Sequence, residues 1–168
     1  EILMMVDAGN ETGAIEESQK EMIANIFEFD DRTAADIMTH RTEIAAVDIH
    51  AGLEEVVSAA SQTGYSRIPV YNETMDDIAG VIYVKDFMEL ILDRSKRFDI
   101  NEYMREVMYV PESKRCSDLF ESFTEKKVQF AVVIDEYGGT SGIVTMEDLL
   151  ESIVGNIQDE YDNEEEEI

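Results

Sequence analysis

The feature that most constrains the fold is a strand-to-helix junction that occurs twice. One copy is Gly142-Ile-Val-Thr-Met-Glu-Asp-Leu-Leu, and the other, 62 residues earlier, is Gly80-Val-Ile-Tyr-Val-Lys-Asp-Phe-Met. In both copies an apolar run is followed by apolar residues at helical spacing, which is typical of a buried strand that leads into a helix. Two copies of one junction in a small chain predict an internal duplication and two versions of one ligand cleft.

The residues around the junctions predict the same order of elements in each half: strand, helix, strand, strand, helix. The first half has expected strands at 43–47, 67–71 and 78–84 and helices at 53–63 and 86–92; the second has strands at 107–110, 129–134 and 142–145 and helices at 116–123 and 146–157. Gly64 is placed to end the first of these helices. Pro69 lacks an N–H group, so its strand is expected at a sheet edge, or Pro69 at a strand start.

The two halves align residue by residue. At a spacing of 62, Ile68 matches Phe130, Val70 matches Val132, and Gly80 matches Gly142. Upstream the spacing grows by one, so that Val56 matches Leu119 and Ala60 matches Phe123.

The chain before the first unit predicts helix only in part. Residues 1–14 show no periodicity, and Gly9, Asn10 and Gly13 are expected to break any helix there. A helix is expected from Ile15 to about Asp30, with an inward stripe that includes Met22, Ile26 and Phe27. A short helix follows, with Thr33 as its N-cap and Asp36 as its capping-box partner.

These elements predict an α/β (α+β) fold of two pseudo-symmetric β-α-β-β-α units packed sheet to sheet, with an N-terminal helix. The expected organisation has five parts: an N-terminal segment and helix at 1–32, unit 1 at 33–92, a linker at 93–102, unit 2 at 103–157, and an acidic tail or linker at 158–168. Because the chain starts at Glu1 inside an apolar patch, we expect it to be a piece of a longer protein.

Charge and cysteine content exclude several classes of function. The net charge is −26, from 39 acidic and 13 basic residues, which opposes nucleic acid binding and attachment to an anionic bilayer. No apolar run approaches the roughly 20 residues of a membrane helix. One cysteine, Cys116, allows neither an internal disulfide nor a cysteine-based zinc site. No metal ligand set and no nucleophile–base pair are recognised, so catalysis is not expected.

The junction in the second half carries chemistry suited to a nucleotide. Gly142 allows a close approach, and Thr145 stands where a helix begins and anions are favoured. Asp148 lies one turn further on the same face, where a carboxylate can accept hydrogen bonds from vicinal hydroxyls such as those of ribose. A plain capping box with no ligand explains the same residues when the motif is taken alone.

With these motifs the chain resembles a tandem CBS-domain pair, or Bateman module, of the CorC/HlyC (hemolysin-like) family, which is related to the cyclin-M transporters. The resemblance covers roughly residues 15 to 162 and rests on four stretches, which are Asp36-Ile-Met-Thr-His-Arg, Tyr65-Ser-Arg-Ile-Pro-Val-Tyr, Asp135-Glu-Tyr-Gly-Gly-Thr-Ser-Gly with the junction that follows, and Gly155-Asn-Ile-Gln-Asp-Glu-Tyr. His40 departs from the family pattern, which has proline there.

The resemblance implies a cleft for an adenosine nucleotide between the two units. The nucleotide-binding residues that it implies are Thr39, Tyr65, Ser66, Arg67, Ile68, Val144, Thr145 and Asp148. Thr145 would hold phosphate, Asp148 the ribose hydroxyls, and Arg67 is a fixed cation suited to phosphate. In the first half, Tyr83 replaces the Ser or Thr of the family pattern, so we expect one occupied site and assign Asp86 to the surface or to a helix cap.

The resemblance also implies a context and a ligand. The expected protein is a regulatory, non-enzymatic module that binds AMP, ADP or ATP on the cytosolic side of an inner (plasma) membrane protein involved in magnesium or divalent-cation transport. Its expected partners are a second copy, in a homodimer formed through the CBS units, and the membrane domain of the full-length protein; Mg²⁺ held through the nucleotide phosphates is left open. Two alternatives remain: a dimerisation unit without ligand, and an enzyme acting on nucleotides.

Overall fold

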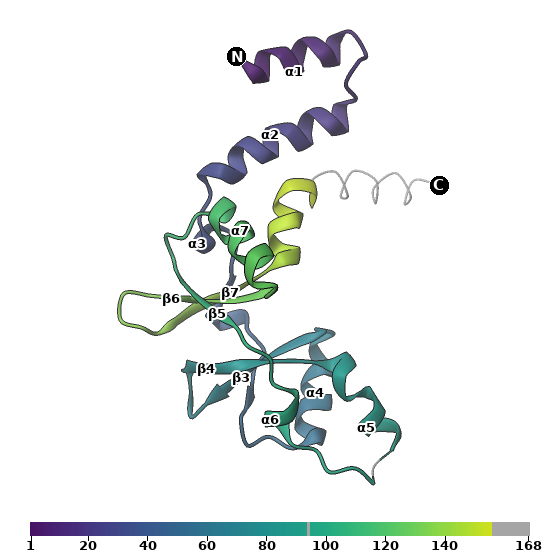
Figure 1. The fold of residues 1–168 in the computed structure, drawn as a ribbon, viewed down its shortest axis with the longest axis vertical. Helices are drawn as coiled ribbons and strands as arrows, with labels where there is room; N and C mark the ends of the chain where they lie inside the picture. The colour runs from purple at the N-terminus through teal and green to yellow at the C-terminus, as the bar shows by residue number, and fades with distance from the viewer. Residues whose placement is uncertain (94, 156–168) are drawn as a thin grey trace.

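The computed structural model describes residues 1–93 and 95–155 and confirms the predicted α/β architecture. Two sheets face each other in the middle of the molecule, and helices cover their outer sides (Figure 1). The N-terminal elements are α1 (Ile2–Glu11), α2 (Glu17–Asp31), α3 (Ala34–Ile37), β1 (Thr39–His40) and η1 (Arg41–Glu43). The first half contains β2 (Val47–Asp48), α4 (Leu53–Thr63), β3 (Arg67–Asn72), β4 (Thr74–Tyr83), η2 (Val84–Phe87), α5 (Met88–Leu92) and α6 (Ile100–Tyr103). The second half contains β5 (Met108–Pro111), α7 (Cys116–Lys126), β6 (Phe130–Ile134), β7 (Thr140–Thr145) and helical residues 146–155.

The sheets of the two halves share an arrangement of three strands, and β1 adds a fourth strand to the second sheet. The strand order is β2-β3-β4 in one sheet and β1-β7-β6-β5 in the other. The sheets meet through apolar side chains of β4 and β6, namely Ile78, Val81, Phe130 and Val132, all buried. Each sheet also packs its other face against the helices of its own half, which gives two further cores. The molecule therefore has three apolar layers, of which the middle one, between the sheets, joins the two units.

Each half receives a short lead-in segment that crosses from elsewhere in the chain. β1 pairs with β7 of the second half, with Thr39 opposite Ile143, and an isolated bridge joins Arg105 to Val81 of the first half. A Cβ atom on Gly142 would lie 2.4 Å from the Thr39 carbonyl oxygen. On Gly80 it would lie 2.8 Å from the Arg105 carbonyl oxygen. The repeated glycine therefore exists in both halves because another backbone passes directly over it.

The strand registers correct the residue-by-residue alignment of the halves. Val70 lies opposite Gly80 in the first hairpin, whereas Val133, not Val132, lies opposite Gly142 in the second. Equivalent residues of the two halves are therefore still 63 positions apart in β3 and β6, as they are upstream. The spacing falls to 62 only at the hairpin tips, where both registers shift. The matches of Ile68 with Phe130 and of Val70 with Val132 are wrong by one residue, which reverses the face to which a side chain points.

The expectation of no helix in residues 1–14 is also wrong. α1 runs through Gly9 and Asn10 and ends near Gly13, which takes a positive φ of 80°. Gly9 is tolerated in the helix because the Ile15 side chain packs against its backbone. A Cβ atom at this position would lie 2.8 Å from the Ile15 Cδ1 atom. The glycine thus lets the chain turn tightly from α1 toward α2.

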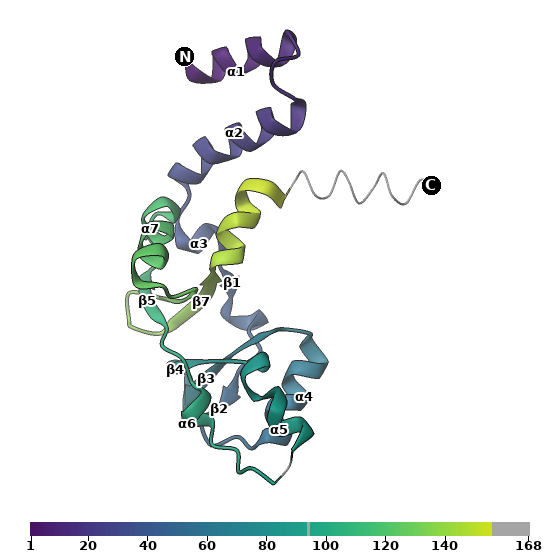
Figure 2. The same ribbon diagram turned by 45° about the vertical axis from the view of Figure 1, so that its right-hand side comes forward.

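The predicted helix after Ile15 is confirmed as α2, but its inward face is different. Met22, Ile26 and Phe27 are 36%, 47% and 40% exposed, whereas Phe29 is buried against the second half. The Asn25 side-chain amide donates a 2.7 Å hydrogen bond to the Ile153 carbonyl in the last described helix. α2 therefore docks through a narrow contact and leaves apolar side chains exposed. Figure 2 shows α2 beyond the sheets, between α1 and α3.

Smaller differences concern element boundaries. The expected strand at 43–47 is a 3₁₀ turn (η1) followed by the two-residue strand β2, and the helix at 86–92 begins as the 3₁₀ turn η2. β3 is the central strand of its sheet, not an edge, and Pro69 fits there because β2 pairs only with Val70 and Tyr71. The expected linker at 93–102 overlaps α6, and the expected helix at 146–157 extends past the described residues. Within residues 1–93 and 95–155, no helix has the length and apolar character needed to span a bilayer.

Candidate functional site

A cleft of about 280 Å³ opens between the two halves, beside the second junction. It is lined by Thr39, Glu43, Ile44, Ala45, Gly64, Tyr65, Ser66, Arg67, Pro69, Phe130, Ile143, Thr145 and Asp148. This volume is close to the lower end of the range for small-molecule sites, roughly 300–1,000 Å³.

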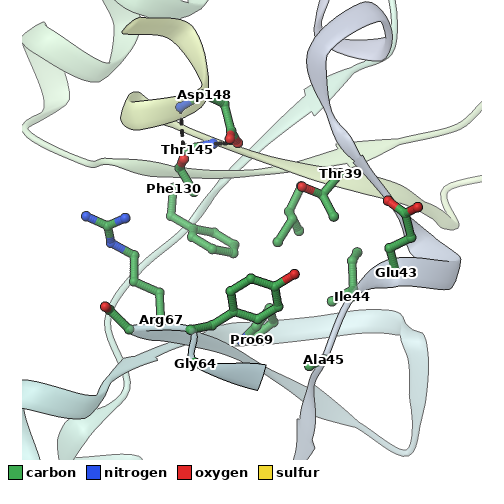
Figure 3. Close-up of a pocket in the computed structure, with 13 residues that line it drawn as sticks. Thr39, Glu43, Ile44, Ala45, Gly64, Arg67, Pro69, Phe130, Thr145 and Asp148 are labelled. Carbon is green, nitrogen blue, oxygen red and sulfur yellow. Dashed lines mark hydrogen bonds between the residues drawn. The ribbon is translucent and has the colours of Figure 1, made fainter. Parts of the chain in front are cut away.

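Six of the eight residues expected at a nucleotide site meet in this cleft, although they come from three separate stretches of chain. The six are Thr39, Tyr65, Ser66, Arg67, Thr145 and Asp148. Figure 3 shows Thr145 and Asp148 on one side of the opening and Thr39 with Glu43 on the other. Gly64 ends α4 with a φ of 72°, which turns the chain so that the next three residues face the cleft.

Ile68 and Val144 do not line the cleft, contrary to expectation. Both are fully buried in the cores between sheet and helices, on the opposite face of their strands. Strand side chains alternate, so with Arg67 and Thr145 toward the cleft, their neighbours Ile68 and Val144 must point away. The apolar wall is made instead by residues that the sequence prediction missed, among them Ile44, Ala45, Pro69, Phe130 and Ile143.

Thr145 and Asp148 bind each other across the first turn of the last described helix. The Thr145 N–H donates to Asp148 Oδ2 at 2.8 Å, and the Asp148 N–H donates to Thr145 Oγ1 at 3.2 Å. The capping box considered from the sequence is therefore present. It leaves the second carboxylate oxygen, Oδ1, on a half-buried side chain that lines the cleft, so capping and ligand binding are compatible.

Arg67 forms an ion pair that joins the two halves. Its Nη1 atom lies 2.7 Å from Glu147 Oε2, and its Nη2 atom bonds the other carboxylate oxygen. The Arg67 side chain is 22% exposed and that of Glu147 is 57% exposed. The hydrogen bonds from Arg67 lower the pKa of Glu147, and the same bonds raise the pKa of Arg67. Both groups are therefore charged at neutral pH.

Negative charge dominates this cleft. Among its lining residues Arg67 is the single base, while Glu43 and Asp148 contribute carboxylates and Glu147 lies beside them. Over residues 1–93 and 95–155, no group of three or more His, Cys, Asp and Glu side chains is arranged to hold a metal ion.

The equivalent position in the first half is arranged differently. Arg105 holds both carboxylate oxygens of Asp86, with Nε–Oδ2 at 2.9 Å and Nη2–Oδ1 at 2.7 Å. The Arg105 guanidinium also stacks 4.1 Å from the centre of the Tyr83 ring. Asp86 is thus an ion-pair residue and not a helix cap. Its carboxylate, the counterpart of Asp148, is already bound by the chain itself.

Comparison with known proteins is consistent with this architecture. The profile of the CBS domain family matches residues 34–93 and 99–155. Hemolysin C of Brachyspira hyodysenteriae is 40% identical over 155 residues, covering 92% of this chain and 57% of the relative. The magnesium and cobalt efflux protein CorC of Escherichia coli K12 is 33% identical over 165 residues, covering 98% and 56%. The chain spans about half the length of these curated relatives.

Solved structures give the same match. The CBS domain of a bacterial CNNM/CorC family Mg²⁺ transporter, in complex with the inhibitor IGN95a, has a TM-score of 0.82 and 34% identity and covers 90% of this chain and 94% of that one. A complex of such a domain with ATP has a TM-score of 0.75 and 36% identity, covering 81% and 96%. A CBS-domain pair from Klebsiella pneumoniae with bound AMP has a TM-score of 0.64 and 30% identity, covering 73% and 98%.

The duplicated fold, the junction motif and these matches agree, and they confirm the resemblance drawn from the sequence. The chain belongs to the CBS-domain family, as a tandem CBS pair of the CorC group.

Proposed function

We propose that the chain is a regulatory module that binds one adenosine nucleotide in the cleft between its two halves. The observation that carries the proposal is the convergence of Thr145, Asp148 and Arg67 on one apolar-walled cavity. The two similar structures solved with ATP and AMP support the choice of ligand.

Each part of a nucleotide has a chemically suitable partner in this cleft. Asp148 Oδ1 can accept hydrogen bonds from ribose hydroxyls while Oδ2 keeps its bond to Thr145. The Thr145 hydroxyl, at the start of a helix, and the Arg67 guanidinium suit phosphate oxygens. Ile44, Pro69 and Ile143 offer an apolar surface for the adenine ring.

The acidic character of the site favours a nucleotide whose charge is partly neutralised. Glu43 and Asp148 outnumber the single lining base, so a triphosphate would meet net repulsion. Mg²⁺ held through the phosphates would reduce that repulsion. We therefore propose that ATP binds with Mg²⁺, while AMP binds without a metal ion.

The proposed setting is the cytosolic side of a membrane protein that handles magnesium or another divalent cation. The choice of ion follows the name of the relative CorC, a magnesium and cobalt efflux protein. The proposed readout is a change in the equilibrium between two shapes of a homodimer, driven by the difference in nucleotide affinity between them. The outer face of the first half offers a surface for such pairing. A groove of about 640 Å³ there is lined partly by Leu53, Val57 and Ile91, and Leu92 beside it is 89% exposed.

Isothermal titration with AMP, ADP and ATP, each with and without Mg²⁺, tests the proposal. We expect saturable binding of AMP without metal, and tighter binding of ATP when Mg²⁺ is present. A thermal unfolding midpoint that no nucleotide shifts, together with flat titrations, would favour the alternative of a dimerisation unit without ligand.

A further inference from the structure

The ion pair between Arg67 and Glu147 occupies the one base among the described residues that line the cleft. A carboxylate and a phosphate both present two oxygens to the guanidinium fork, so they compete for the same two N–H donors. Glu147 already uses both terminal nitrogens of Arg67. A phosphate that takes the end-on position between the two terminal nitrogens of Arg67 must therefore displace Glu147.

The position of Glu147 makes this displacement possible without unfolding. Glu147 is the residue before Asp148, in the first turn of the last described helix, and its side chain is more than half exposed. The reciprocal bonds between Thr145 and Asp148 use neither the Glu147 carboxylate nor Arg67, so exchange at Arg67 does not require breaking them. The released carboxylate can turn to solvent, whereas Arg67 stays anchored in β3 and above the Tyr83 ring, 5.2 Å from its centre.

We propose that Glu147 is an internal competitor for the nucleotide phosphate, held on Arg67 and exchanged for phosphate when the nucleotide binds. The inference rests on the proposed function and deepens it, because it names a residue that sets affinity without touching the ligand in the bound state. Since Arg67 lies in the first half and Glu147 in the second, the exchange also replaces a direct link between the halves by one that runs through the ligand.

The test compares Glu147→Gln with Glu151→Gln, which removes the same charge from an exposed site one turn further along the helix. Titration of AMP into each variant should show about five-fold tighter binding for Glu147→Gln, the gain expected from removing a partly exposed ion pair. Glu151→Gln should stay within two-fold of the unmodified protein. Adenosine, which lacks phosphate, should bind both variants as it binds the unmodified protein.

The same substitution in an Arg67→Ala background shows whether Glu147 acts by occupying Arg67 or by repelling the phosphate directly. In Arg67→Ala, the added change Glu147→Gln should no longer tighten AMP binding, because the two residues act through each other. A gain that persists in Arg67→Ala overturns the exchange, as does unchanged or weaker AMP binding by Glu147→Gln alone. Either result contradicts the exchange but leaves the proposed nucleotide binding intact. If neither the unmodified protein nor any variant binds AMP, both the exchange and the proposed function are overturned.

Discussion

At the residue scale, Asp148 is part of a capping box and, in the proposed function, also the acceptor for the ribose hydroxyls; substitution can separate the two roles. Asp148→Ala should weaken AMP binding by about 1–3 kcal/mol, because the ribose hydroxyls lose a charged acceptor. It should also cost about 0.5–2 kcal/mol of folding stability, because the capping box with Thr145 is lost. Isothermal titration and urea unfolding measure the two effects.

Asp99→Ala is the matched control for the cap. Asp99 caps α6, where its carboxylate accepts the Asn101 N–H at 3.1 Å, and it is not among the cleft residues. We expect a similar loss of stability and no change in affinity. If Asp148→Ala behaves in the same way, its carboxylate is only a helix cap.

The Arg67–Glu147 pair makes a specific contribution to pH dependence. The pKa of Glu147 is lowered in the folded state from its ordinary value of 4.5, so the pair stabilises the fold above about pH 4.5. This contribution disappears as the pH falls through the lowered pKa. It should amount to at most about 1 kcal/mol because the carboxylate is largely exposed.

Urea unfolding between pH 3 and 7 checks this contribution. The stability difference between the unmodified protein and Glu147→Gln should be largest near pH 6–7 and should shrink toward pH 3. A difference that grows on acidification would mean that the pair does not stabilise the folded state.

The residue scale also shows how far the sequence can define the site. Thr145 and Asp148 could be predicted from the local chemistry and spacing of the junction motif, whereas Thr39 and Arg67 were assigned through the family resemblance. Ile68 could have been excluded by the alternation of a strand that places Arg67 in the cleft. Glu43 and Ile44 could not be predicted, because they reach the cleft from η1 and the residue that follows it, and no periodic pattern marks that segment.

At the scale of elements, the junction glycines position the lead-in segments. Gly142→Ala would place a Cβ 2.4 Å from the Thr39 carbonyl oxygen and 2.7 Å from Met38 Sδ. β1 must then move off β7, which should cost about 1–3 kcal/mol of stability and should weaken AMP binding by displacing Thr39.

Gly80→Ala is the control, since its Cβ would lie 2.4 Å from Met104 Cγ in the first half, where Thr39 does not reach. We expect a comparable loss of stability, measured by urea unfolding, with AMP affinity preserved. Equal losses of affinity in both variants would show that the effect is general and does not act through Thr39.

The order of elements could be predicted because each half repeats one pattern of apolar residues. The extra residue of the first hairpin could not be located, because the tips of both hairpins are polar and either alignment keeps apolar residues in the strands. The helix α1 was missed because Gly9 lowers helix propensity locally, while its packing against Ile15 depends on tertiary structure. The pairing of β1 with the second half is a long-range choice that local spacing does not encode.

For the whole molecule, the proposed homodimer can be tested by its surface. Leu92→Glu places a charge beside the apolar groove of α4 and α5, on a side chain that is 89% exposed in one chain. We expect a shift from dimer to monomer in size-exclusion chromatography with light scattering, because the charge would be buried in the interface.

Met4→Glu is the control, because the Met4 side chain is 73% exposed and lies on α1. Figure 1 shows α1 at the opposite end of the molecule from α5. This variant should remain dimeric. Dissociation by Met4→Glu and not by Leu92→Glu would move the interface to the N-terminal helices.

The central claim is that the two halves enclose one nucleotide, although the strand-to-helix junction beside the cleft occurs in both halves. The second-half carboxylate, Asp148, keeps an oxygen for the ligand, whereas its counterpart Asp86 gives both oxygens to Arg105. We therefore expect the nucleotide in the second-half cleft. In the first half a groove of about 440 Å³ lies beside Tyr83 and Arg105, but the counterpart carboxylate there is already paired.

The stoichiometry of AMP binding, measured by calorimetric titration of the unmodified protein and of Asp86→Ala, tests this claim most directly. The account predicts one AMP per chain in both proteins, with closely similar affinities. Two AMP molecules per chain in the unmodified protein, or loss of binding in Asp86→Ala, would contradict it.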